Sequence, residues 1–448
     1  MVQTSLFPSN KLLKTYDAIR TSFWFVPCLI IFATLLLFAS LLWLDQNLAL
    51  QNTLWISSLY HANGEVTRDL LTTVAGSVMT VVSITFSITM VALTSASSQF
   101  GPRLIRNFMN DTSTQSVLGI FISIFIYCLM LAAASENFAS GLYLPGLTLG
   151  GAIILTFSGI FLLIYFIHHV ATNLQADNVI DNVFETMQTN ILHIFDEQRS
   201  NESKDASCKS VERTLKNSFT PIHIKRSGYV QAINYTNLVQ ILSSYDQCAE
   251  LLVTPGDYIT SRMVVIHHSG DEPSPTQIQS LLSCITLGAK RTPIQDPEFA
   301  ILQLVEIALR ALSPSINDPY SAIACVDKLS STLCNLVHKQ FPEGIACDNE
   351  DKPRLIFKKA SFQSLANSAY DQIRQHANGS LSVQLRLLEG LCRIAEQAQK
   401  KEHWEFIRQQ KNMLEHELRK HDFVDHDMQE INERITLLEH IIAKRSLC

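Results

Sequence analysis

The sequence predicts an α-helical membrane protein with four transmembrane helices, followed by a cytoplasmic α+β module and a mostly helical C-terminal region. Three observations lead to this class. Four apolar runs long enough to cross a bilayer lie in the first 167 residues, charged residues are scarce there, and the rest of the chain has the composition of a soluble protein. The 448 residues are 47% hydrophobic and 17% charged, whereas an average soluble domain is roughly 25% charged.

The distribution of charge excludes several classes of protein. The first 167 residues contain six Lys/Arg and six Asp/Glu, and the remainder contains 29 and 35, so the formal net charge of −6 belongs to the remainder. This division excludes a purely soluble protein, a disordered protein and a membrane protein made only of spans. No long stretch is basic, so we expect no nucleic-acid partner.

Each apolar run has the length that a bilayer core about 30 Å thick requires of a helix, roughly 20 residues. The four runs are residues 22–44, 70–93, 117–135 and 146–167, and none has a charged residue or a histidine in its interior. The first run is too long for a signal-peptide core and no small-residue cleavage site follows it, so we expect it to remain as an anchor. Residues 22–167 therefore form a predicted four-helix transmembrane domain.

Basic residues flank the runs unevenly, which predicts the orientation. Arg103 and Arg106 follow the second run, and the two alternate loops hold Arg68 alone. Three basic residues precede the first run: Lys11, Lys14 and Arg20. By the positive-inside rule, the N-terminus and everything after residue 167 lie in the cytoplasm, as in a multi-pass protein of the bacterial inner membrane. Residues 1–21 form a cytoplasmic segment, either a short interfacial helix or a simple flank.

The second run carries an unusual stripe of small, mostly hydroxylated residues. Two rows with a seven-residue period form it: Thr73, Gly76, Thr80, Ser83, Ser87, Met90, Thr94 and Ser97. At helical periodicity all eight lie on one face. One interpretation is close packing against another helix, which small and hydroxylated residues favour. The other is that several copies of this helix line a water-filled path. The absence of an ionisable residue at mid-membrane disfavours a proton relay.

The fourth run ends in a pair of histidines and contains a small-residue face. Gly146 and Gly150 form a G-x-x-x-G pair that Gly151 and Gly159 extend, which predicts close helix contact. The adjacent His168 and His169 have two interpretations: a titrating or metal-binding pair, or solvated side chains at a helix exit.

Beyond the membrane we expect three regions. Residues 168–217 form a helical extension and linker, in which the fourth span continues as one long helix to residue 199. Its apolar stripe then needs cover from other elements or from a neighbouring subunit. Residues 218–290 form a small α+β module built on a single four- or five-stranded sheet. Residues 291–448 are helical apart from one strand at 354–359, and the last two helices form a hairpin.

The region around residues 311–322 has two interpretations. Pro314 ends one helix, Asn317 suits a tight turn, and Asp318 and Pro319 are an N-cap and a first helical residue, so a structural helix–turn–helix corner explains them. The alternative is a charged site that binds a small ion or joins subunits. Its candidates are Arg291, Asp296, Glu306, Arg310, Asn317 and Asp318.

Three stretches together resemble a bacterial membrane-protein family known as domain of unknown function 2254: residues 98–103, 291–297 and 308–319. The resemblance covers nearly the whole chain. It differs at Ser315, where family members commonly have glycine. The resemblance implies an integral membrane protein with a cytoplasmic C-terminal domain, and it implies no activity.

The expected function is an oligomeric channel or pore-type protein, in which the second transmembrane helix lines the path and the cytoplasmic domain assembles or senses. The alternative is a membrane-anchored sensor or scaffold that binds a small ligand or a protein partner and has no pore. An enzyme is not expected, since the common phosphate-binding, dinucleotide-binding, metalloprotease and hydrolase motifs are absent. The ten cysteines show no metal or disulfide spacing, so we expect no metal and no cofactor. The expected partners are the bilayer, further copies of the chain and a small ion or ligand.

Overall fold

A computed structural model describes ten stretches of the chain, which divide into two units. The units are Met1–Asn178, called here the membrane unit, and Val179–Cys448, called the second unit. The described stretches are residues 24–47, 64–102, 111–138, 146–199, 219–270, 272–341, 344–358, 360–377, 379–421 and 423–445. The expected N-terminal segment, residues 1–21, and residues 200–217 of the expected extension and linker lie outside them.

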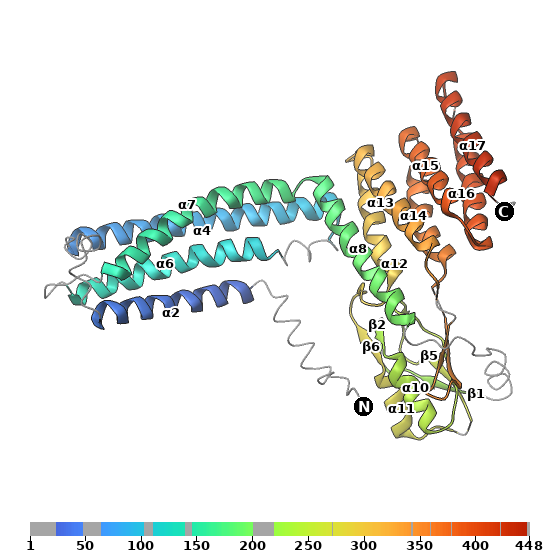
Figure 1. Cartoon of the computed structure of the whole chain (residues 1–448), viewed down its shortest axis with the longest axis horizontal. Coiled ribbons are helices and arrows are strands. Elements are labelled where there is room, and N and C mark those ends of the chain that lie inside the picture. The colour runs from blue at the N-terminus through green and yellow to red at the C-terminus, as the bar shows by residue number, and fades with distance from the viewer. Residues whose placement is uncertain are drawn as a thin grey trace. The chain divides into compact units, whose positions relative to one another are not determined.

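The described residues of the membrane unit form four long helices (Figure 1). They are α2 (Phe25–Asn47), α4 (Gly64–Phe100), α6 (Thr112–Phe138) and α7 (Gly146–Asn173). All four are long and apolar enough to cross a membrane, which confirms the four expected spans. Each helix extends beyond its apolar run at one or both ends, because polar residues that follow a run still continue the helix.

Helix α6 is the centre of this unit and packs against α2, α4 and α7. Its Tyr127 is 1% exposed, lies edge-on to Phe38 of α2 and donates a hydrogen bond to the Thr148 carbonyl of α7 at 2.8 Å. At the same end, the Asp45 carboxylate of α2 accepts hydrogen bonds from the Leu147 and Thr148 amides at 2.9 and 2.8 Å, and so caps α7. The C-terminal end of α2 therefore meets the N-terminal end of α7, and these two helices are antiparallel.

Glycines allow the close approaches in this bundle. A Cβ at Gly119 of α6 would lie 2.8 Å from the Pro27 backbone of α2, and one at Gly151 of α7 would lie 2.6 Å from the Tyr127 hydroxyl. Gly159 also faces α6, at Ile124. The expected close helix contact is confirmed for Gly151 and Gly159.

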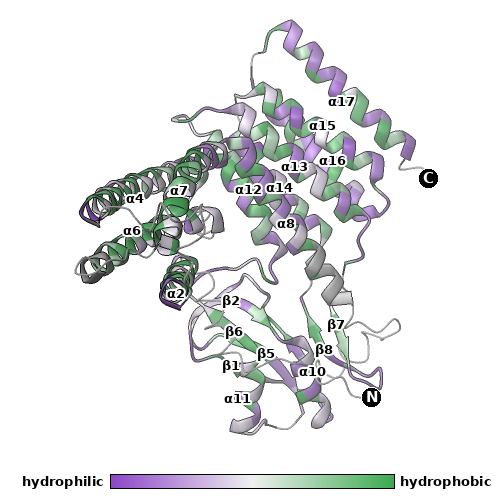
Figure 2. Ribbon diagram, turned by 60° about the vertical axis from the view of Figure 1, so that its left-hand side comes forward, coloured by the Kyte–Doolittle hydropathy of each residue, from purple (hydrophilic) through white to green (hydrophobic). Residues whose placement is uncertain are grey.

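Exposed aromatic residues mark both ends of α2. Trp24 is 74% exposed and Trp43 is 63% exposed, and the rise of an α-helix separates them by about 28 Å. This separation matches a hydrocarbon core about 30 Å thick with tryptophans at both interfaces. Figure 2 shows the four helices as predominantly hydrophobic along their lengths. The bilayer, and not the rest of the chain, is the environment that fits these outward faces.

The fourth span does not continue as one long helix, so that expectation is wrong. Helix α7 ends at Asn173 and α8 (Ala176–Arg199) begins after a two-residue turn. The Asn178 side chain donates to the Thr172 carbonyl at 2.7 Å, so a side chain takes a bond that helical backbone would otherwise make. The apolar face of α8 is covered within the second unit. It comprises Val179, Ile180, Val183, Met187, Ile191 and Ile194, all buried.

The second unit contains two sheets, not the single expected one. The five-stranded sheet has the order β1-β5-β3-β8-β7 and the three-stranded sheet has the order β4-β2-β6. All neighbours are antiparallel except β3 and β8. The strands are β1 (Phe219–His223), β2 (Gly228–Ile233), β3 (Ala249–Leu251), β4 (Tyr258–Ile259), β5 (Val264–Ser269), β6 (Ile285–Gly288), β7 (Ile345–Cys347) and β8 (Pro353–Phe357). Helices α10 (Tyr235–Ser244) and α11 (Pro275–Ser283) complete this part.

The helical part of the second unit follows the expected pattern closely. Its helices are α12 (Pro297–Ala311), α13 (Pro319–Val337), α14 (Phe362–His376), α15 (Leu381–Gln397), α16 (Lys401–Leu418) and α17 (Asp425–Arg445). One relation differs from the expected hairpin, because α17 packs mainly against α15 rather than against α16. Arg434 of α17 pairs with Glu389 of α15 at 3.5 Å.

Candidate functional sites

The stripe on α4 faces away from the rest of the membrane unit. Seven of its eight residues are exposed and Ser97 is half-buried. The face of α4 that packs on α6 is formed by other residues: Leu71, Ala75, Val82, Thr85 and Ala96, all buried. At 100° per residue the two faces lie roughly opposite each other. A Cβ added at Gly76 would meet no atom within 4 Å, so no other described helix of the chain covers the stripe there.

Four of the six stripe hydroxyls bond to their own helix. Thr73 donates to the Asp69 carbonyl at 2.7 Å, and Thr80 donates to the Gly76 carbonyl at 3.1 Å. Ser83 and Thr94 make the same bond, each to the carbonyl four residues earlier at 3.0 Å. Each such hydroxyl donates its proton to a carbonyl of α4, and its oxygen lone pairs remain available as acceptors. At these four positions the stripe can therefore contact another helix, or present acceptor oxygens, without leaving a donor unsatisfied.

The charged candidates of the second unit lie at both ends of α12. At the start, Asp296 is 2% exposed and caps the helix by accepting from the Phe299 amide at 3.0 Å. Arg291 pairs with Asp296 at 2.7 Å and with Glu298 at 3.2 Å. Burial raises the pKa of the Asp296 carboxyl, and the Phe299 amide and Arg291 oppose that rise. A Cβ at Gly256 would lie 2.3 Å from the Asp296 carboxylate. The Arg291–Asp296 ion pair therefore packs closely between the turn at Gly256 and the start of α12.

At the other end of α12, the hydrogen bonds of the corner at residues 311–322 stabilise the turn and the start of α13. Asn317 has a positive φ of 48°, and Asp318 caps α13 by accepting from the Ser321 amide at 3.1 Å. Glu306 and Arg310 pair at 3.8 Å on α12. The 15 residues of the helix separate its ends by about 22 Å. The structure therefore brings Arg291 and Asp296 together, keeps them apart from the corner, and does not unite the six candidates in one site. The position with positive φ is Asn317, two residues beyond Ser315.

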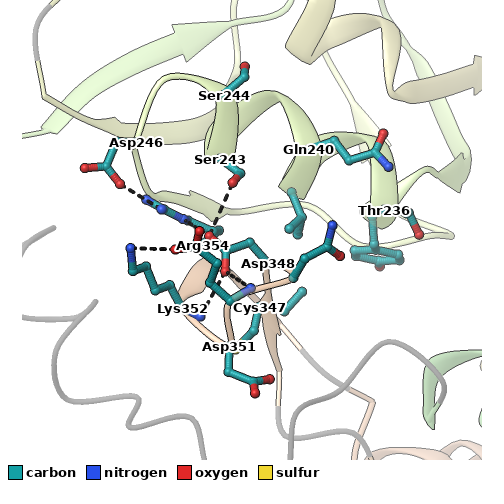
Figure 3. A pocket seen from close by; sticks show the side chains of 15 residues that line it. Thr236, Gln240, Ser243, Ser244, Asp246, Cys347, Asp348, Asp351, Lys352 and Arg354 are labelled. Carbon is teal, nitrogen blue, oxygen red and sulfur yellow. Dashed lines mark hydrogen bonds and ion pairs between the residues drawn. The ribbon is translucent and has the colours of Figure 1, made fainter.

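A cavity that sequence reasoning missed lies between α10 and the segment around β7 and β8 (Figure 3). Its volume is about 850 Å³, within the range of small-molecule sites. Arg354, with 7% of its side chain exposed, lies between Asp246 and Asp348, at 2.7 Å from each. Ser243 donates to the same Asp348 carboxylate at 3.3 Å.

On one wall of this cavity, Asp348 and Arg354 form an ion pair in which the carboxylate stays ionised. Burial opposes ionisation of Asp348, but Arg354 and the Lys352 and Glu350 amides outweigh it and lower its pKa to about 2. No pattern in the sequence indicates this cavity, because α10 and the Asp348 loop lie more than 100 residues apart and meet through the packing of α10 on β7 and β8.

The two histidines at the end of α7 have different surroundings. His168 is exposed, whereas Nε2 of His169 lies 2.8 Å from a carboxylate oxygen of Asp111. Among the residues that the structure describes, no three His, Cys, Asp or Glu side chains gather as metal ligands would.

Comparisons with known proteins agree with this architecture. A family model described as "Predicted membrane protein (DUF2254)" matches residues 20–393. Uncharacterised proteins of Mycobacterium bovis and Mycobacterium tuberculosis are each 31% identical over 337 residues, which is 73% of this chain and 64% of the relative. The match thus spans less than two thirds of these relatives' length, and no solved structure matches. The chain belongs to the DUF2254 family of membrane proteins.

Proposed function

We propose that this membrane protein is a homo-oligomer in which the α4 helices of several copies face one another along the stripe and surround a path for small ions. The observation that carries this proposal is the exposure of the stripe on the membrane unit. The basic residues that flank the spans support an inner-membrane protein with its N-terminus and second unit in the cytoplasm.

The chemistry of the stripe supports cations over anions as the permeant class. Four of the stripe hydroxyls direct their protons to backbone carbonyls of the same helix, so the outward groups at these positions are oxygen lone pairs. Rings of such oxygens would replace part of a cation's hydration without a charged selectivity ring. Gly76 and the small serines would let neighbouring α4 helices approach closely.

Reconstitution into liposomes with a cation-flux assay tests the proposal. Thr80→Leu and Ser87→Leu place bulk on the stripe and should reduce flux. Ser77→Leu is the matched control, because Ser77 is also an exposed hydroxyl of α4 bonded to its own helix, at 2.8 Å, but lies off the stripe. A protein that runs as a 50.3 kDa monomer in a detergent micelle, or that shows no flux, would contradict the pore.

A second candidate function is a membrane-anchored sensor without a pore, and the cavity beside Arg354 favours it. In that case the second unit binds a small ligand and performs no catalysis. Gln240 lines the cavity on an exposed part of α10, so Gln240→Trp should fill it. A metabolite that raises the melting temperature of the full chain, and no longer does so in Gln240→Trp, would support the sensor.

A further inference from the structure

One side chain at the end of the bundle has two incompatible hydrogen-bond partners. His169 lies in the last turn of α7, and its Nε2 is 2.8 Å from an Asp111 oxygen at the start of α6 and 3.0 Å from Nδ2 of Asn173. An ionised carboxylate only accepts hydrogen bonds, and the amide nitrogen of asparagine only donates them. A single ring nitrogen cannot serve both partners, because it donates when it carries a proton and accepts when it does not.

We propose that His169 is a proton-operated switch that fastens the start of α6 to the end of α7. In the imidazolium, Nε2–H donates to Asp111 and joins the two helices by an ion pair. In the neutral ring the proton stays on Nδ1, Nε2 accepts from Asn173, and Asp111 is released. This inference does not depend on whether α4 lines a path.

The Asp111 carboxylate is held in place by hydrogen bonds from the start of α6. It accepts from the Ser113 and Thr114 amides at 3.1 and 3.3 Å and from the Thr114 hydroxyl at 2.6 Å. Burial opposes ionisation of Asp111, but the hydrogen bonds from Thr114 and His169 outweigh it, and its pKa is lowered. These capping bonds remain when the imidazole is released, so the start of α6 stays helical but loses one stabilising contact and opens more often.

The surroundings of the ring favour the two states described. The Tyr165 ring is stacked on His169 at 5.5 Å and its hydroxyl lies 3.4 Å from the Ser113 hydroxyl. Among the described residues, Asp111 from α6 and Tyr165 from α7 are the titratable groups that contact the ring. The adjoining ends of α2 and α4, residues 24–40 and 85–102, contain no acidic, basic or imidazole side chain. A carboxylate at a helix N-terminus and a cation at a helix C-terminus are both favoured by the helix dipoles.

The position of the switch gives it a consequence. The turn at residues 174–175 follows directly and ends α7, and Asn178 closes that turn onto Thr172. The state of His169 therefore decides whether the segment through which the chain leaves the bundle is joined to α6 by an ion pair.

The first test reads the ring nitrogens directly. Full-length protein labelled with ¹⁵N-histidine in nanodiscs is measured by NMR across roughly pH 5 to 8, where imidazoles titrate, and His169→Gln identifies the signal. We expect Nε2 of His169 to carry a proton at the acid end and to lose it at the alkaline end. A neutral ring that keeps its proton on Nε2 would overturn the proposal, because it could donate to Asp111 throughout.

The second test reads the helix contact by hydrogen exchange of peptides covering residues 111–116. We expect protection, corrected for intrinsic exchange, to fall about fivefold on raising the pH, the ratio that corresponds to a typical net hydrogen bond of ~1 kcal/mol. His169→Gln and Asp111→Asn should remove this pH dependence. His168→Gln is the matched control and should keep it. Equal pH dependence in all four proteins would refute the switch.

Discussion

The membrane unit and the second unit satisfy their polar groups in different ways. In the membrane unit large apolar side chains point outward, such as Phe161 at 73% exposed, and hydroxyls such as Thr80 bond within their own helix. In the second unit polar groups join different elements inside the core, as Ser330 of α13 and Tyr370 of α14 do at 2.7 Å. The difference follows from the solvent. Lipid offers no hydrogen-bond partner to an outward polar atom, so such an atom bonds within its own helix, whereas water offers one to the outward polar atoms of a soluble unit.

The two units are therefore sensitive to substitution at different kinds of position. In the membrane unit the sensitive positions are the close helix approaches, whereas outward hydroxyls contribute little to the fold. In the second unit the sensitive positions are buried polar contacts between elements.

The largest effect is expected at Gly119, on the inward face of the membrane unit. A Cβ there would lie 2.8 Å from the Pro27 Cα, and backbone cannot move aside easily. Gly119→Leu should cost about 3 kcal/mol or more and greatly reduce the yield of folded protein in detergent. Gly76→Leu, on the outward stripe, should leave the melting temperature of the chain unchanged and weaken the oligomer. Equal loss of folded protein in both variants would contradict the predicted difference between the inward face at Gly119 and the outward stripe at Gly76.

A smaller effect is expected at Gly390 in the second unit. A Cβ at this position of α15 would lie 2.3 Å from both the Ser330 and Tyr370 hydroxyls, so Gly390→Ala should destabilise the unit by about 1–3 kcal/mol. Thermal or denaturant unfolding of the full chain measures this cost. The cost should shrink when Ser330→Ala and Tyr370→Phe are combined with it, because the crowded oxygens are then gone. An undiminished cost would show that the polar contact is not the cause.

Acid should destabilise the second unit through His403. This side chain is 1% exposed, and its Nδ1 accepts from the Gln399 and Lys400 amides at 3.2 Å. Burial, and next the charges of Lys400 and His338, lower its pKa from 6.5 to about 4. The folded state thus binds fewer protons than the unfolded state between these values, and stability present above pH 6.5 is lost as the pH falls toward 4.

Fluorescence of the neighbouring Trp404, itself 9% exposed, can follow this unfolding in the full chain. His403→Asn keeps an acceptor and removes the titration, so its melting temperature should vary less between the same two pH values. A variant as acid-sensitive as the parent would assign the effect to other groups.

The smallest effects compare two hydroxyls of the membrane unit. Thr80→Val removes a hydroxyl that bonds within α4 and should change stability by less than ~0.5 kcal/mol. Tyr127→Phe removes the bond between α6 and α7 and should cost about 1 kcal/mol. Thermal unfolding in detergent compares them, and the opposite order would contradict the division proposed here.

The membrane helices were predictable from the sequence because length and the absence of charge suffice to identify a span. The helices α12, α13 and α14 were predictable because Asp296, Asp318 and Ser361 cap them as such residues usually do. The sheets were less predictable. The two- and three-residue strands β4 and β7 show no alternation long enough to detect, and β3 pairs with β8 across about a hundred residues.

Of the site residues, the stripe on α4 could be recognised from its period, and its outward direction could not. That direction depends on which face meets α6, a tertiary property. The contact between Asp111 and His169 joins residues 58 positions apart, so no local pattern marks it. The turn after α7 contains no glycine or proline, and the side chain of Asn178 that stabilises it gives no signal of its own in the sequence.

The length of α4 has a mechanical consequence. Its 37 residues measure about 55 Å, whereas the hydrocarbon core measures about 30 Å. Even at a tilt of about 40°, near the upper limit for membrane helices, some 16 Å of the helix must extend beyond the hydrocarbon core. Such an extension acts as a lever, because a sideways force on its end produces a torque on the part of α4 inside the core. Tilting α4 in this way would shift the stripe sideways along most of its length, so the helix that presents the stripe can also transmit movement to it.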